Sequence, residues 1–179
     1  MKLLRTIRLD PSDTFVFERA AEPGEWAVSG AFAFAHLDGT KLEGKTRAAF
    51  RSGFLGIDSL GWSTLVQIVE ASNEDRASAV ELLARRLVER FGAPDLATAR
   101  PAAEEEIAFA ASLSDHPKGM LAAVSRKNEN GMIREAFRTL TPSVGPKPLR
   151  AYAFLEVAGE EEPPQEHVDL MTIAKGERT

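Results

Sequence analysis

The fold is decided by residues 120–139, MLAAVSRKNENGMIREAFRT. Asn130-Gly131 in this stretch is the strongest short-range signal for a two-residue hairpin turn, since both residues tolerate positive φ. The register that follows pairs Glu129 with Met132, Lys127 with Arg134, Arg126 with Glu135, and Val124 with Phe137. Opposite charges and apolar side chains meet on the face of Arg126 and Val124, as in stable cross-strand pairs. The face that carries Lys127 is predicted to be solvated.

Outward from this hairpin, the chain alternates short strand patterns with a few helices. Strand patterns bounded by turn residues cover 3–9, 14–18, 26–37, 62–71 and 149–157. Apolar residues at helical spacing predict helices over 42–54, 72–91 and 101–116. Ser72 and Asp75 have the spacing of a capping box, and Pro101 fits a first helical turn. Repeated βαβ alternation is absent, so we predict an α+β fold: an antiparallel sheet of about six or seven strands with two or three helices packed on one face.

The domain organisation follows from a change in composition near residue 157. We expect residues 1–157 to form a single α+β domain and residues 158–179 to form an acidic linker and C-terminal tail. The run Glu160–Glu162 followed by Pro163-Pro164 is typical of a solvated linker. The tail then brings back four apolar residues: Val168, Leu170, Met171 and Ile173. These residues dock on their own domain, on a second copy to give a homodimer, or on a different protein.

Composition and charge exclude several classes of function. The chain has no cysteine, which removes disulfides, thiolate metal sites and cysteine nucleophiles, and favours a cytoplasmic location. The net charge of −5 disfavours nucleic acid and anionic lipid as partners. No stretch approaches the roughly 20 apolar residues that span a bilayer. We therefore expect no nucleic-acid partner and no membrane partner.

One segment matches a phosphate-binding motif. Gly39, Gly44, Lys45 and Thr46 have the phosphate-loop spacing of glycine, four residues, then Gly-Lys-Thr, between a predicted strand and a predicted helix. Lys45 would reach the β- and γ-phosphates and Thr46 would ligate magnesium. Against this, Glu43 places a carboxylate inside the loop, and the antiparallel hairpin does not suit a phosphate-loop fold. We expect an accidental match, and a nucleotide-binding enzyme using Gly39–Thr46 is an alternative.

Other catalytic constellations are weaker. The histidines are His36, His116 and His167, and their separation in sequence offers no local metal-ligand spacing. A metal-dependent enzyme would have to assemble these dispersed histidines from distant segments, and it forms a further alternative. No serine lies in a nucleophile elbow. We predict no cofactor and no metal.

Several stretches resemble a known family. They are FVFERA at 15–20, GEWAVSG at 24–30, RPAAEEEI at 100–107 and IREAFR at 133–138. They are similar to a small family of uncharacterised, mostly proteobacterial proteins, some of which carry a ring-hydroxylating dioxygenase name. A Rieske centre needs two cysteines, so the sequence does not support that name. The resemblance implies no activity and no site residues.

These observations give one leading hypothesis for a protein of otherwise unknown function. The chain has ample residues for a fold and no convergent catalytic chemistry. We therefore expect a non-catalytic binding or accessory protein that engages a partner protein or a small ligand. An enzyme is the less favoured class.

Overall fold

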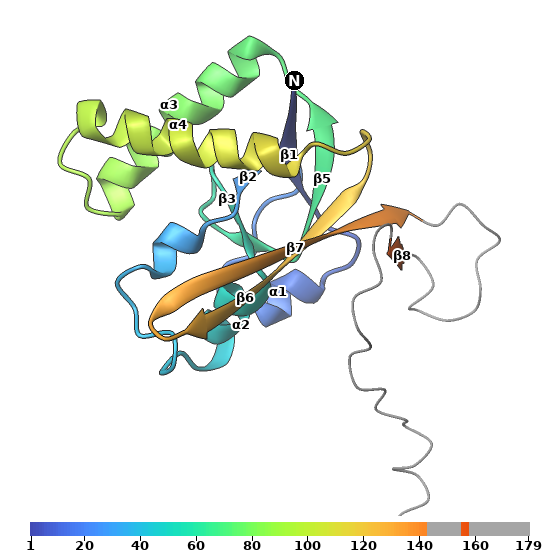
Figure 1. The fold of residues 1–179 in the computed structure, drawn as a ribbon, viewed down its shortest axis with the longest axis horizontal. Coiled ribbons are helices and arrows are strands. Elements are labelled where there is room, and N and C mark those ends of the chain that lie inside the picture. Colours follow the sequence, from blue (N-terminus) through green and yellow to red (C-terminus); the bar gives the residue numbers. More distant parts are fainter. Residues whose placement is uncertain (143–154, 158–179) are drawn as a thin grey trace, which may run out of the picture.

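The computed structural model describes residues 1–142 and 155–157 (Figure 1). Its sheet has eight strands in the order β4-β3-β2-β1-β5-β6-β7-β8, and every paired neighbour is antiparallel. The strands are β1 (Lys2–Ile7), β2 (Trp26–Val28), β3 (Phe54–Gly56), β4 (Trp62–Ser63), β5 (Leu65–Glu70), β6 (Leu121–Glu129), β7 (Met132–Pro142) and β8 (Leu155–Val157). The α-helices are α1 (Ser12–Val16), α2 (Gly44–Ser52), α3 (Asn73–Arg90) and α4 (Leu96–Leu113). The predicted α+β class is confirmed.

The β6–β7 hairpin has the predicted register. Arg126 lies opposite Glu135 and Val124 lies opposite Phe137, as do the other predicted pairs. Asn130 and Gly131 have φ values of 54° and 80°, which is the left-handed conformation that a type I′ turn requires at both positions. The turn residues therefore set which side chains share each face of this sheet region.

Along β5–β7 one face of the sheet carries the core, and we call it the inner face. Val66, Ile68 and Val124 on this face share one apolar cluster with α3 and α4 residues such as Leu83 and Ile107. Ile133 of β7 packs with Phe50 of α2 in a second, smaller cluster. In Figure 1, α3 and α4 lie side by side, and the β6–β7 hairpin crosses in front of the shorter strands.

The strand predicted over 14–18 is wrong, and the strand predicted over 26–37 is wrong in part. Residues 12–16 form α1, because the buried Asp13 carboxylate accepts hydrogen bonds from the backbone amide of Thr64 at 3.1 Å and from its hydroxyl at 2.5 Å. The strand predicted over 26–37 ends at Val28, since Gly30 takes a φ of +80° and starts a 3₁₀ helix at Ala31–Phe34. The contact between Asp13 and the distant Thr64 and the left-handed conformation of Gly30 therefore override the local strand pattern.

The helix predictions hold at one boundary and fail at another. Ser72 caps α3 as predicted: its hydroxyl accepts from the Asp75 amide at 3.0 Å, and the Asp75 carboxylate accepts from the Ser72 amide at 2.9 Å. Helix α4 instead begins one turn earlier than predicted, because Asp95 accepts from the Thr98 amide at 2.7 Å. Pro101 therefore lies inside the helix, where it cannot donate a backbone hydrogen bond to the preceding turn.

Of the C-terminal region after residue 142, the structure describes only β8. The strand predicted over 149–157 is present at Leu155–Val157, paired with β7. The acidic linker and the apolar tail of 158–179 lie outside the described residues. Within the part that is described, no helix has the length and apolar character to cross a membrane.

Candidate binding face on the β6–β7 hairpin

The outer face of the hairpin, opposite the core, carries a group of cations. Lys127, Arg134 and Arg138 share this face because side chains alternate along each strand, and all three are exposed. Arg134 Nε lies 3.6 Å from an oxygen of Glu129, and both side chains are more than half exposed. Among the described residues, no carboxylate forms an ion pair with Lys127 or Arg138. Two of the three cations are thus available to an anionic partner.

The residues between these cations are small. Ser125 lies opposite Ala136, and Ala123 lies opposite Arg138, so small side chains separate Arg138 from the Lys127–Arg134 pair. Small side chains between charged ones do not obstruct an extended segment that approaches this face. We call this surface, made of Ala123, Ser125, Lys127, Arg134, Ala136 and Arg138, the cationic face.

The inner face of the same hairpin holds a buried arginine. The Arg126 side chain has 0% exposure, and its Nε donates to Glu135 at 2.6 Å. Its Nη1 donates to the carbonyls at the end of α2, at 3.1 Å for Phe50 and 2.7 Å for Gly53. Its Nη2 donates to the backbone carbonyl and hydroxyl of Ser29.

These contacts use every nitrogen of the Arg126 guanidinium, so Arg126 has no donor left for a ligand. Burial lowers the pKa of Arg126 from its usual value, and the bond to Glu135 opposes that change. The Ser29 hydroxyl donates to Glu135 as well. The arrangement ties the hairpin, the end of α2 and the segment after β2 together, which is a structural role.

Glu106 of α4 is the titratable group beside this cluster. The pKa of Glu106 is raised to about 7, first by burial and then by the charge of Glu135, while the charge of Arg126 opposes the rise. A carboxyl with this pKa changes its charge near neutral pH, a property that catalytic acids and bases share with some structural groups. Since Arg126 and Ser29 are engaged by protein partners, the geometry here favours the structural reading.

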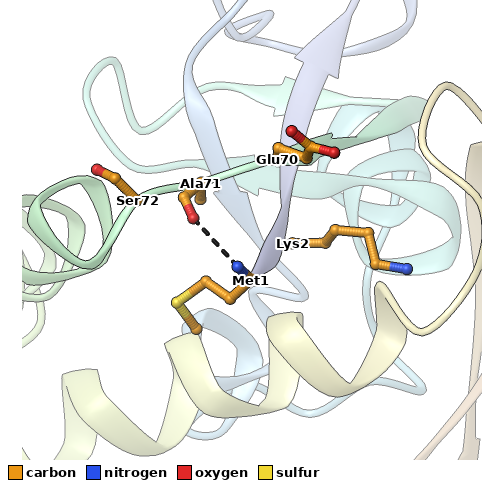
Figure 2. Close-up of a pocket in the computed structure, with 5 residues that line it drawn as sticks. All are labelled: Met1, Lys2, Glu70, Ala71 and Ser72. Carbon is orange, nitrogen blue, oxygen red and sulfur yellow. Dashed lines mark hydrogen bonds between the residues drawn. The ribbon is translucent and has the colours of Figure 1, made fainter.

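A concave region lies at the start of β1. It has a volume of about 470 Å³ and is lined by Met1, Lys2, Glu70, Ala71 and Ser72, which are drawn as sticks in Figure 2. The terminal amine of Met1 donates to the Ala71 carbonyl at 3.4 Å, and the Lys2 amine donates to the His116 carbonyl at 2.5 Å. The side chains of Met1, Lys2 and Ser72 point in different directions (Figure 2). The hollow therefore gathers no convergent set of polar groups.

The phosphate-loop motif lies in a different context from the one predicted. Gly39 lies in the turn before α2, and Gly44, Lys45 and Thr46 form its exposed first turn. The element before the loop is the 3₁₀ helix Ala31–Phe34 and not a strand, which corrects the predicted strand–loop–helix order.

An acid that directly precedes this loop accepts hydrogen bonds from it. Asp38 accepts hydrogen bonds from the Thr40 amide and hydroxyl, at 3.0 and 2.6 Å, and forms an exposed ion pair with Lys41 at 3.2 Å. These bonds, those from Thr40 first, lower the pKa of Asp38. A side chain at Gly39 would come within 2.6 Å of the Asn128 amide, so this glycine allows the loop to approach the hairpin. Packing explains Gly39 without a nucleotide.

The histidines are dispersed. His36 follows the 3₁₀ helix and His116 follows α4, both are exposed, and His167 lies outside the described residues. Within residues 1–142 and 155–157, no group of three or more His, Cys, Asp or Glu side chains is placed to hold a metal ion.

The comparisons with known proteins concern the chain as a whole. Neither the curated proteins nor the solved structures give a match. Residues 1–153 match a family of unknown function, DUF6505, which is consistent with the resemblance seen in the sequence. That match spans the sheet from β1 through β7, the helices and the cationic face. The chain therefore belongs to the DUF6505 family, a family of unknown function.

Proposed function

We propose that this protein is a non-catalytic binding or accessory protein and that its cationic face engages an acidic segment of a partner protein. The observation that carries this proposal is the exposed pair Lys127 and Arg138, for which no ion pair is found among the described residues. Cations that only keep a protein soluble do not need to lie together on one face. A gathered set raises the local concentration of an anionic partner and speeds its association.

The contrast with the buried cluster supports binding over catalysis. A catalytic site needs a polar group that is free to contact substrate, and Arg126 is engaged by protein acceptors at each of its nitrogens. The cationic face has the opposite character, since its side chains are exposed. On the grounds of composition and charge, the same proposal assigns the protein to the cytoplasm, with no cofactor and no nucleic-acid or membrane partner.

The test uses a fluorescein-labelled polyglutamate peptide as the acidic probe. Its binding to the full chain is measured by fluorescence anisotropy at low and at high salt. We expect Arg138→Glu to weaken binding about fivefold to tenfold, because a charge reversal removes one attraction and adds one repulsion. Binding by the natural sequence should also weaken steeply with added salt.

The matched control is Arg85→Glu on α3, an exposed arginine whose reversal changes the net charge by the same amount. If Arg138→Glu and Arg85→Glu weakened binding equally, the proposal would be overturned. Such a result would show that binding depends on the net charge of the protein and not on the cationic face. Absence of binding at low salt would overturn the proposal as well.

A further inference from the structure

The cationic face has a nearby acidic segment in its own chain. Strand β8 lies antiparallel to β7, with Leu155 beside Pro142 and Val157 beside Leu140. The chain direction at Val157 therefore leads along β7 from Leu140 toward Arg138. Two residues, Ala158 and Gly159, separate Val157 from the acidic run at 160–162. At roughly 3.3 Å per residue, this run is within reach of the cationic face.

The register of β8 indicates which acidic residue would meet the cations. If the pairing of Leu155–Val157 continued one residue at a time, it would bring Gly159 beside Arg138 and Glu161 beside Ala136. The side chain of Ala136 lies between those of Arg138 and Arg134 on the outer face, and diagonal neighbours in a sheet are within reach of long side chains. Glu161 would then have an arginine on each side.

The same register limits the contact. It would bring Glu162 opposite Glu135, and like charges directly opposite each other are destabilising. Pro163 and Pro164 follow and cannot donate backbone hydrogen bonds to a neighbouring strand. Such a contact would therefore be short and centred on Glu161. Short exposed ionic contacts are weak, which makes this one reversible.

The distribution of charge along the chain also favours a contact between the acidic segment and the cationic face. Residues 158–179 hold six acidic and two basic side chains, so most of the net charge of −5 belongs to this segment. The remaining 157 residues are close to neutral. An acidic segment tethered beside exposed cations has a high effective concentration there, because only a short span of chain separates the two.

We propose that the acidic segment around Glu161 docks on the cationic face in its own chain and competes with an acidic partner for that face. The competition rests on the proposed function, since a competitor matters only where a partner binds. The docking of the segment does not depend on the proposed function. A partner must displace the segment, so its apparent affinity is reduced by the fraction of chains in which the face is already occupied.

The docking is tested by paramagnetic broadening in the full chain. Because the sequence has no cysteine, Gln165→Cys introduces a single attachment site for a nitroxide spin label. We expect the label to broaden the backbone amide signals of residues 134–138, and we expect the broadening to disappear at about 1 M salt, where the Debye length is about 3 Å.

Two further variants make this test specific. Added to the labelled chain, Glu161→Lys should lower the ratio of docked to undocked chains about fivefold. Glu177→Lys, which makes the same charge change farther along the segment, should leave the ratio nearly unchanged. Equal effects of the two substitutions, or no broadening over 134–138, would overturn the proposal.

A mixed sample separates docking within one chain from docking on a second copy. Unlabelled ¹⁵N protein is mixed with spin-labelled ¹⁴N protein, and broadening of the ¹⁵N signals would mean a contact between two chains and would overturn the proposal. The two proposals can also fail separately. If the signals of residues 134–138 are broadened but no variant binds polyglutamate, only the proposed function is overturned. If polyglutamate binds, Glu161→Lys does not strengthen its binding and no signals are broadened, only the docking is overturned.

Discussion

The two faces of the β6–β7 hairpin hold the same kind of side chain in opposite environments. Arg126 on the inner face is buried and donates to Glu135, to Ser29 and to the end of α2. Arg138 on the outer face is exposed, and no ion-pair partner is found for it in the described part of the chain. A buried guanidinium must have its donors satisfied by protein, whereas an exposed one is satisfied by water. The first therefore stabilises the fold, and the second is available to a partner.

The largest expected effect tests the buried side of this comparison. Arg126→Met should destabilise the fold by about 3–5 kcal/mol, because it leaves Glu135, whose side chain is only 16% exposed, without its cation and leaves the last carbonyls of α2 without their donor. Urea unfolding at neutral pH, followed by far-UV circular dichroism, measures this loss. Arg138→Met on the outer face is the matched control and should change stability by no more than about 0.5 kcal/mol. Similar losses in the two variants would break the comparison.

The next largest effect is a pH dependence of the stability, caused by Glu106 beside the inner face. Glu106 has an ordinary pKa near 4.5 in the unfolded chain and a raised pKa of about 7 in the folded protein, mainly because it is buried. Between these values the folded state holds a proton that the unfolded state has released. The contribution of Glu106 therefore becomes unfavourable as pH rises from about 4.5 to 7, and stability falls over that window.

Glu106→Gln should remove this dependence. The difference in unfolding free energy between the variant and the natural sequence should grow by about 1–3 kcal/mol from pH 4.5 to pH 8, a range that allows for solvent screening of a partly exposed carboxyl. Urea titrations across that range measure it. Glu105→Gln is the control, since Glu105 is an exposed neighbour on α4. A flat difference for Glu106→Gln would mean that Glu106 is as well solvated as Glu105.

The smallest effect concerns an exposed cation away from the hairpin. Lys45→Ala at the start of α2 should leave the melting temperature unchanged, with or without ATP and magnesium, because Lys45 is exposed and the amide of Thr40 in the loop already donates to Asp38. A ligand at 100 times its dissociation constant would add about 2.7 kcal/mol to stability, so a thermal-shift assay detects a real site. Stabilisation of the natural sequence by ATP that Lys45→Ala abolishes would restore the nucleotide hypothesis.

The features that could be predicted from sequence are those decided by nearby residues. The Asn130-Gly131 turn fixes the register of β6 and β7, because both residues must adopt positive φ and few others do so readily. The capping box joins Ser72 to Asp75, three residues apart, and marks the start of α3. The cations of the outer face also follow from the register alone, since alternation along a strand assigns each side chain to a face.

The tertiary structure decided the rest, because burial and hydrogen bonding there depend on residues far apart in sequence. Asp13 converts a predicted strand into a helical turn through Thr64, 51 residues away. Arg126 becomes the buried anchor of the hairpin through the carbonyls of Gly53 and Ser29, 73 and 97 residues away. The sequence by itself determined that Arg126 would face Glu135. Only the packing of α2 against β6 removed Arg126 from water, because desolvation depends on every segment that surrounds a side chain.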